Sequence, residues 1–321
     1  MNVKFGIVGL GRISSRFAKV LNTMDGVELT SVASSDQSRS DAFAKKFGAK
    51  KAYHNYLDVI TDNQVDIIYI GLTTNYHYEV TKLCLQHHKA VLCEKPLVIT
   101  QQDAEELTAL AAKNKTLLME AMWTRCLPAF LKAKEWVKAD RIGQVKLITA
   151  NFCYPKEYDP ENRQFNPKLA GGGLYDVGIY PINFAAGILA EYPDEVNGLA
   201  KISPSGVDEF SVISMSFPGG ALASLTCGFT VLAKGEAVIY GTGGHIVLEN
   251  CFGPQKCDLY NEEGRLIDQF FEPVADGFAY EIRHCADLFL QGKLESDLIP
   301  WQDTINCTGI FDTLMKQWKL R

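Results

Sequence analysis

Apolar runs and helix-period patterns alternate along the first third of the chain. The runs predict strands at Val3–Val8, Glu28–Ala33, Asp66–Ile70, Ala90–Cys93 and Thr116–Met119. The spacing between them predicts amphipathic helices at Ile13–Asn22, Ser38–Phe47, Tyr76–Gln86 and Thr100–Ala112. Strands that alternate with helices are typical of crossover units in a parallel sheet. The first third is therefore predicted to be a doubly wound α/β domain.

The pattern changes after Trp123-Thr124-Arg125. A helix at Ala129–Lys138 precedes a strand at Lys146–Tyr154, and a polar loop then leads to Gly171-Gly172-Gly173. Between Val196 and Phe271 strand-like runs follow one another across Gly and Pro turns, at Glu209–Phe217, Ala221–Phe229, Glu236–Tyr240 and His245–Glu249. Consecutive strands without helices predict a large, mainly antiparallel open sheet. Helices at Gly277–Gln291 and Trp301–Leu320 close the chain.

These patterns place a domain boundary near residue 121. Residues 1–121 are expected to form the doubly wound domain, and residues 122–321 an α+β domain for substrate binding and dimerisation. The last helix is expected to pack back on the first domain. A sheet that helices cover on one face needs a partner for the other, so we expect a homodimer through this sheet.

Composition and charge narrow the function classes. With 47% hydrophobic and 22% charged residues, the 321-residue chain has an ordinary globular composition that suits two domains. A net charge of −6 without a basic stripe opposes a nucleic-acid partner. No run approaches the roughly 18 apolar residues of a membrane helix. The chain begins directly with a strand and shows no secretory leader, so a cytoplasmic location is expected.

The cysteines do not suggest disulfides or a metal. Nine are scattered without a Cys-x-x-Cys pair, which favours reduced thiols. Cys84, His87 and His88 lie within about one helical turn, but no second pair with zinc-site spacing accompanies them. We therefore expect no metal ion.

The turn Gly9-Leu10-Gly11-Arg12-Ile13-Ser14 follows the first strand and opens a helix. In that context Gly9 permits a tight turn, Gly11 lets a pyrophosphate approach the backbone, and the amides at Arg12 and Ile13 attract phosphate. Ser14 replaces the third glycine and is small enough to keep the helix close to the sheet. The turn predicts a nicotinamide dinucleotide site.

The end of the second strand should contact the ribose, where Asp or Glu favours NAD and Arg favours NADP. Ser34, Ser35 and Arg39 can bind a 2′-phosphate, whereas Asp36 would repel it unless turned away. These residues favour NADP and leave NAD as the alternative.

A further strand ends in Glu94-Lys95-Pro96, at the sheet edge where open parallel sheets bind ligands. Together with the glycine turn and Gly171-Gly172-Gly173-Leu174-Tyr175-Asp176-Val177-Gly178-Ile179-Tyr180, this motif resembles the glucose-fructose oxidoreductase, inositol dehydrogenase and rhizopine catabolism (Gfo/Idh/MocA) family. The resemblance spans nearly the whole chain. It implies an NAD(P)-dependent dehydrogenase or reductase with Glu94 and Lys95 at the cofactor.

Within that family, Glu120-Ala121-Met122-Trp123-Thr124-Arg125 and Tyr180 resemble the branch of dimeric dihydrodiol dehydrogenases and NADP-dependent xylose dehydrogenases. Inositol-type members carry a histidine where this chain has Tyr180 and an acid where it has Asn183. The resemblance therefore implies an aldose or cyclic diol substrate.

Hydride transfer to or from an alcohol carbon needs a group that takes or returns the hydroxyl proton. Tyr180 suits this role, and an ammonium such as Lys95 nearby would favour the phenolate. Asp176 lies four residues before Tyr180, so both are expected on one helix face. A bare carboxylate would oppose the phenolate, so Asp176 is expected to orient Lys95 or a substrate hydroxyl.

The resemblance also implies contacts from further residues. Thr73, Asn75 and His77 follow a strand at the same sheet edge and are expected near the cofactor, with His77 structural or cofactor-proximal but not catalytic. Substrate contacts are expected from Trp123, Arg125, Arg163, Asp176, Tyr180 and Asn183.

Less specific interpretations remain open. Tyr180 could be a helix aromatic with a wet hydroxyl, Lys95 a surface lysine, and Gly171–Gly173 a flexible hinge. At the level of function, the alternatives are a non-catalytic dinucleotide-binding sensor and a biliverdin-type reductase on the same fold.

Overall fold

The computed structural model describes residues 2–320, which divide into two compact units. The first contains residues 2–98, 102–122 and 278–304, and the second contains residues 99–101, 123–277 and 305–320. Residues 1 and 321, which the expected domains 1–121 and 122–321 include, lie outside the described part. Each unit is thus assembled from separate stretches of the chain.

The first unit is built on a six-stranded parallel sheet in the order β3-β2-β1-β4-β5-β6. Its strands are β1 (Val3–Val8), β2 (Val27–Ala33), β3 (Lys51–Tyr53), β4 (Ile67–Ile70), β5 (Ala90–Glu94) and β6 (Leu118–Ala121). Successive strands are added toward one edge from β1 to β3 and toward the other edge from β4 to β6, so the switch point lies between β1 and β4, as in dinucleotide-binding doubly wound folds. The central strands are almost entirely buried, because helices cover both faces of such a sheet.

Apart from α3 and η1, the helices of the first unit lie close to their expected positions. They are α1 (Arg12–Leu21), α2 (Gln37–Phe47), α3 (Tyr56–Thr61), the 3₁₀ turn η1 (Thr74–Tyr76), α4 (His77–Gln86), α5 (Gln101–Asn114), which begins in residues of the second unit, and α8 (Phe278–Leu290). The first residues of α9 (Trp301–Gln317) also belong here. Phe17 of α1 stacks on Tyr69 of β4 with 3.7 Å between ring centroids. This pair anchors α1 on the sheet beside the glycine turn.

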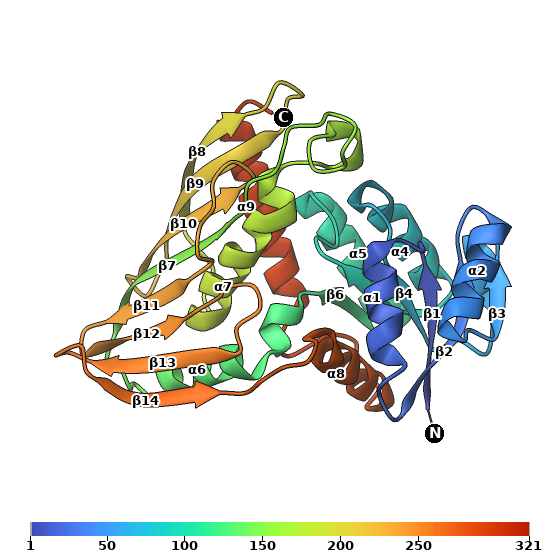
Figure 1. The fold of residues 1–321 in the computed structure, drawn as a ribbon, viewed down its shortest axis with the longest axis horizontal. Coiled ribbons are helices and arrows are strands. Elements are labelled where there is room, and N and C mark those ends of the chain that lie inside the picture. The colour runs from blue at the N-terminus through green and yellow to red at the C-terminus, as the bar shows by residue number, and fades with distance from the viewer. Residues whose placement is uncertain (1, 321) are drawn as a thin grey trace. The chain divides into compact units, whose positions relative to one another are not determined.

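The second unit is built on an eight-stranded sheet in the order β14-β13-β12-β11-β7-β10-β9-β8 (Figure 1). Its strands are β7 (Val145–Cys153), β8 (Glu195–Ile202), β9 (Asp208–Ser216), β10 (Leu222–Gly228), β11 (Ala237–Gly241), β12 (Gly244–Leu248), β13 (Lys256–Asn261) and β14 (Leu266–Phe271). All neighbours are antiparallel except β7 and β10, which run parallel. The expected fold class, a doubly wound domain plus a mainly antiparallel open sheet, is confirmed.

Helices pack on one face of this second sheet. They are the 3₁₀ turn η2 (Trp123–Cys126), α6 (Pro128–Lys138), the 3₁₀ turn η3 (Pro167–Leu169), the π-helical turn η4 (Leu174–Gly178), α7 (Ile179–Leu189) and the rest of α9. α7 contacts β7 and β10, and α6 contacts β13 and β14. Burial alternates along β9, where Ile213 and Met215 are buried while Val212 and Ser214 are exposed. The sheet therefore has a helix-covered face and an open face.

The sequence pattern missed β3 and α3 in the first unit. Both are short, at three and six residues, and too brief to establish a period. No helix within residues 2–320 is both long enough and apolar enough to cross a membrane.

Candidate active site

The glycine turn has the geometry that a dinucleotide phosphate requires. Gly9 has φ +84°, and a β-carbon there would lie 2.6 Å from Leu72 Cδ2, so only glycine fits. A β-carbon at Gly11 would meet nothing within 4 Å, so the backbone faces open space at the start of α1. No side chain caps this helix end among the described residues. The turn and the first amides of α1 therefore fit a pyrophosphate.

Ser14 takes the place of the third glycine for a physical reason. Its Oγ donates a hydrogen bond of 2.5 Å to the Gly9 carbonyl and is buried. A β-carbon at Gly71 would lie 2.1 Å from this Oγ, so Gly71 provides the space that Ser14 fills. The serine thus braces the turn from inside.

The residues after β2 that were expected to contact the ribose differ in exposure and in their hydrogen bonds. Ser34 is buried, and its Oγ donates to the Asp36 carbonyl at 2.7 Å. Asp36 caps α2 by accepting from the Arg39 amide and from Ser38 Oγ, and these hydrogen bonds lower the pKa of its carboxyl. Ser35 and Arg39 are exposed.

Glu94 and Lys95 lie at the carboxyl end of β5. The Glu94 carboxylate is buried and accepts a 2.6 Å hydrogen bond from Tyr69 Oη. Burial raises the pKa of Glu94 against the opposing effects of the Tyr69 hydrogen bond and the Lys95 charge. Lys95 itself is half-buried.

Buried polar side chains also hold the two residues that follow Lys95. His77 Nδ1 lies 2.8 Å from the Pro96 carbonyl, and Nε2 lies 3.1 Å from the Leu72 carbonyl. The Leu97 amide donates at 2.9 Å to Glu120, whose other oxygen accepts from Thr304 Oγ1 at 2.6 Å. The backbone that follows Lys95 is therefore fixed. Thr73 precedes η1 and is half-buried, and Asn75 lies within η1 and is exposed.

The glycine triplet is buried and closely packed, which is unlike a flexible hinge. A β-carbon at Gly171 would lie within 2.8 Å of three carbonyl oxygens, those of Arg163, Gln164 and Asn166. Gly172 has φ +124°, and a β-carbon there would lie 2.4 Å from Asp208 Oδ1. These glycines bring the chain against β9 at the start of η4. The helix that carries Asp176 and Tyr180 thus begins in a tightly specified turn.

Asp176 lies in the π-helical turn and is held by two residues of the preceding loop. Its Oδ1 accepts from Arg163 Nη2 at 3.1 Å, and its Oδ2 accepts from Gln164 Nε2 at 2.5 Å. Gln164 is buried and also contacts Tyr154 Oη and Lys156 Nζ. Single π-helical turns occur frequently at functional sites. Gln164, Tyr154 and Lys156, which the sequence did not single out, therefore join the candidate site through Asp176.

Tyr180 lies on α7 within an aromatic cluster. Its Oη accepts from Trp123 Nε1 at 3.3 Å. Its ring packs edge-on against Phe152 and Phe252, with centroids 5.4 and 6.1 Å away, and those two rings stack on each other at 3.9 Å. Trp123 in turn is fitted against Gly253 and Gly277, where a β-carbon would meet the indole. The phenol is therefore held by an indole and two phenyl rings.

Arg125 and Asn183 are both buried and contact each other. Arg125 Nη1 lies 3.3 Å from the Asn183 carbonyl, and its guanidinium lies 5.5 Å from the Phe130 ring centroid. Asn183 Nδ2 donates to the Ile179 carbonyl at 3.1 Å. A β-carbon at Gly187 would overlap the guanidinium. These contacts tie η2 and α6 to α7.

The expected residues form two groups. In the first unit, the glycine turn, the β2 end, η1 and the Lys95 loop all follow carboxyl ends of parallel strands. In the second unit, Trp123 contacts Tyr180, and Arg163 contacts Asp176. Within residues 2–320 no group of three or more His, Cys, Asp or Glu side chains could hold a metal ion, and all nine cysteines are buried and free of disulfides.

Comparison with known proteins finds one family over both units. Residues 3–122 match the family described as "Oxidoreductase family, NAD-binding Rossmann fold", and residues 130–247 match the "GFO/IDH/MocA C-terminal domain". The chain is 31% identical over 326 residues to a human trans-1,2-dihydrobenzene-1,2-diol dehydrogenase, covering 98% of this chain and 97% of the relative. The mouse enzyme of the same name is 30% identical over 312 residues, covering 94% and 92%.

Solved structures share the fold. A 3-ketoreductase from Actinomadura kijaniata, in complex with NADP and TDP-benzene, superposes with a TM-score of 0.88 at 24% identity over 98% of both chains. A levoglucosan dehydrogenase, in complex with NADH and levoglucosan, superposes with a TM-score of 0.90 at 18% identity, covering 100% of this chain and 98% of the other.

Proposed function

The chain belongs to the Gfo/Idh/MocA family of oxidoreductases with an NAD(P)-binding fold, and we propose that it transfers a hydride between NADP and a small polyhydroxylated ring. The reacting carbon would be a CH–OH or C=O group of an aldose or a trans-dihydrodiol. The names of the relatives, dihydrodiol dehydrogenases with 31% identity, support this substrate class.

The preference for NADP over NAD rests on the segment after β2. Ser35 and Arg39 are exposed where the ribose is expected, and the Asp36 carboxylate is engaged in capping α2. Arg suits a ribose 2′-phosphate, whereas a carboxylate directed at the ribose would favour NAD.

The observation that carries the proposal is the environment of Tyr180. An indole N–H only donates, so Trp123 makes Tyr180 Oη the acceptor, and the phenol's own proton is not used in that bond. Donation to Oη also stabilises negative charge on that oxygen. A proton acceptor and donor among apolar rings suits a reaction in which the hydroxyl oxygen loses a proton while the carbon that bears it loses a hydride.

NADP supplies or accepts the hydride when bound, and the chain handles the proton. We assign Tyr180 as general acid/base, with Oη taking the hydroxyl proton during oxidation and returning it during reduction. Lys95 would favour the phenolate through its positive charge. Asp176, held by Arg163 and Gln164, would orient a substrate hydroxyl or the Lys95 ammonium. Gly9, Gly11, Arg12 and Ile13 would hold the pyrophosphate at the start of α1.

The rings around Tyr180 also suit a cyclic substrate. Trp123, Phe152 and Phe252 present apolar edges and faces, and the polar group of Gln164, Tyr154 and Asp176 is held by the loop before the glycine triplet. A saturated sugar or a dihydrodiol offers both an apolar ring face and hydroxyls.

Replacing Tyr180 tests the proposal. Tyr180→Phe should lower kcat by about 10²- to 10⁴-fold, the usual contribution of general acid/base catalysis, while the affinity for NADPH stays within about twofold. Tyr175→Phe is the matched control, since it removes one hydroxyl from the preceding turn, and it should keep kcat. Unchanged turnover in Tyr180→Phe would refute the assignment.

A substrate screen tests the class. Aldoses, trans-dihydrodiols and a linear tetrapyrrole would be assayed with NADP and with NAD, following absorbance of the reduced nicotinamide. Turnover of sugars or diols is expected, with higher kcat/KM for NADP. Turnover of the tetrapyrrole alone would favour the reductase alternative, and cofactor binding without turnover of any compound would favour a sensor.

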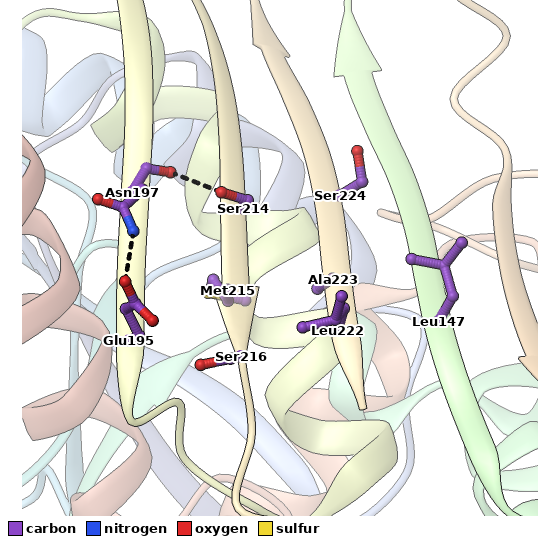
Figure 2. Close-up of a pocket in the computed structure, with 9 residues that line it drawn as sticks. All are labelled: Leu147, Glu195, Asn197, Ser214, Met215, Ser216, Leu222, Ala223 and Ser224. Atoms are coloured by element: carbon purple, nitrogen blue, oxygen red, sulfur yellow. Dashed lines mark hydrogen bonds between the residues drawn. The ribbon is translucent and has the colours of Figure 1, made fainter. Parts of the chain in front are cut away.

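We further propose that the chain forms a homodimer through the open face of the second sheet and acts in the cytoplasm. The open face carries exposed apolar side chains, including Leu199 on β8, which is 82% exposed, and Leu222 on β10, which is 55% exposed. A hollow of about 310 Å³ lies on it, and Figure 2 shows the side chains that line it. The nine cysteines without disulfides are consistent with a reducing compartment.

A further inference from the structure

Asp208 is a buried acid that the proposed chemistry does not use. It is the first residue of β9, and its exposed fraction is 0%. Its Oδ2 accepts a 2.7 Å hydrogen bond from the Leu174 amide, at the start of η4. Its Oδ1 has no hydrogen-bond partner within residues 2–320. A fully buried carboxylate oxygen without a partner is costly, so this placement needs an explanation.

The glycine triplet is shaped around this carboxylate. A β-carbon at Gly172 would lie 2.4 Å from Oδ1, and one at Gly173 would lie 3.1 Å from Oδ2 and 3.2 Å from Gly228 Cα. Gly172 also adopts φ +124°, which side-chain-bearing residues rarely accept. Side chains at Gly172 and Gly173 would therefore collide with the carboxylate in its place at the start of the helix.

The Asp208 carboxylate lies at the N-terminal end of a helical segment, where a negative charge is favourable. The helical segment runs from Leu174 through η4 and α7 to Leu189, and it carries Asp176 and Tyr180. The N-terminal end of a helix bears a partial positive charge, and a carboxylate there forms charge-assisted hydrogen bonds with the first amides. Apart from Asp176, which Arg163 and Gln164 bind, Asp208 is the acid placed at this helix start.

We infer that Asp208 is a positioning residue, which fixes the start of the helix that carries Tyr180 and Asp176 and thereby sets the place of the Tyr180 hydroxyl. The inference rests on the proposed function, because it assumes that Tyr180 is the acid/base. Asp208 acts through the backbone of Leu174 and the glycine turn, not on the substrate.

The charge on Asp208 makes this positioning sensitive to pH. Burial raises the pKa of Asp208 to about 7, against the opposing hydrogen bonds from the Leu174 and Gly173 backbone. The titratable neighbour from β10 is Cys227, whose thiol stays protonated because burial raises its pKa. On the helix, Asp176 is bound to Arg163. Above neutral pH the ionised carboxylate holds the helix start firmly, and below it the neutral acid accepts only an ordinary hydrogen bond.

The sharpest test is Asp208→Asn, which keeps an acceptor oxygen and removes the charge. At pH 8 its kcat should fall about tenfold, the effect of losing one charge-assisted bond, with KM and the Kd for NADPH within about twofold of wild type. At pH 6 the two enzymes should converge, because wild-type Asp208 is then mostly protonated. A merely structural role would not produce this convergence. Ser211→Ala, also buried on β9, is the control and should leave kcat unchanged.

Two further results separate this inference from the proposed function. If Tyr180→Phe loses turnover while Asp208→Asn matches wild type at every pH, the positioning role is wrong and the acid/base role stands. If Tyr180→Phe keeps turnover, the proposed function fails whatever Asp208 does. Should Asp208→Asn not fold, the amide proton of Leu174 in wild type decides, followed by NMR: a chemical shift that titrates between pH 6 and pH 8 supports the inference, and a shift independent of pH overturns it.

Discussion

His77 faces a conflict between its hydrogen-bond partners and its charge. Both ring nitrogens face carbonyl oxygens, Pro96 at 2.8 Å and Leu72 at 3.1 Å, and carbonyls only accept. A protonated ring would satisfy both, but the residue is 1% exposed, and burial, together with the Lys95 charge, lowers the pKa of His77 below its usual 6.5. The ring is thus held neutral, and it links the end of β4 to the Lys95 loop.

Replacing His77 should therefore destabilise the fold in a pH-dependent way. We expect His77→Phe to lower the free energy of unfolding by about 1 to 3 kcal/mol at pH 8, because buried carbonyls lose a donor. A base whose folded pKa is depressed contributes less stability as pH falls below its unfolded pKa, near 6.5. The gap between wild type and His77→Phe should narrow from pH 8 to pH 5, as measured by urea unfolding.

His77→Asn is the conservative partner of this variant. Its amide nitrogen can donate near the position of Nδ1, so the Pro96 carbonyl keeps a partner and about half of the loss should be recovered. His284, whose pKa burial also lowers, remains in both variants and cancels in the comparison. A gap that widens toward pH 5 would contradict a neutral His77.

At the scale of the elements, the turn formed by Gly171, Gly172 and Gly173 tolerates no side chain without a close contact. We expect Gly172→Ala to lower the melting temperature and kcat together, because it adds backbone strain at φ +124° and a β-carbon 2.4 Å from Asp208 Oδ1. Gly220→Ala is the matched control, with φ +82° and nothing within 4 Å of the new β-carbon. It should cost only about 1 kcal/mol of left-handed strain. Equal losses in calorimetry and kcat for the two variants would rule out the steric contact.

The sequence predicted most elements of both sheets within two residues. The helix at Gln37–Phe47 and the strand at Asp208–Ser216 were recognisable because a period of about 3.6 or of 2 follows directly from which face is buried. The parallel pairing of β7 with β10 was not predictable, since the two strands lie about 70 residues apart in the sequence and their periods do not show which strands pair. The π-helical turn at Leu174–Gly178 also left no period in the sequence.

Candidate site residues could be predicted only where residue type and order along the chain form a recognisable motif. The glycine turn and the segments with Lys95 and Tyr180 stood out by residue type and order. Gln164 and Asp208 did not, because a buried polar residue acquires its role from a partner distant in sequence, as Asp208 does from the Leu174 amide.

At the scale of the whole molecule, the open face of the second sheet decides the oligomeric state. Leu199 and Val212 are register partners on adjacent strands, and Leu222 pairs with Leu147, which pairs with Tyr240. All five side chains point to the same face, because paired residues of a sheet share a face and Val212 pairs with Thr226, in step with Leu222. Ser214 and Ser224 lie opposite each other between them. Charged side chains on this face include Glu195 and Lys201 on the edge strand β8, and Lys256 and Asp258 on β13, which pair with each other at 2.7 Å.

Ser214 and Ser224, with the apolar side chains beside them, suit the centre of an isologous interface between two copies. Such an interface commonly covers about 800 Å² on each partner. We therefore expect wild type to be a dimer by light scattering with size-exclusion chromatography at micromolar concentration. Ser224→Arg should yield a folded monomer, because pairing would bury an uncompensated charge. Leu290→Arg, at an exposed leucine of α8, is the control and should stay dimeric. A dimeric Ser224→Arg would exclude this face, and kcat per chain should survive in the monomer, since α7 and Tyr180 lie on the covered face.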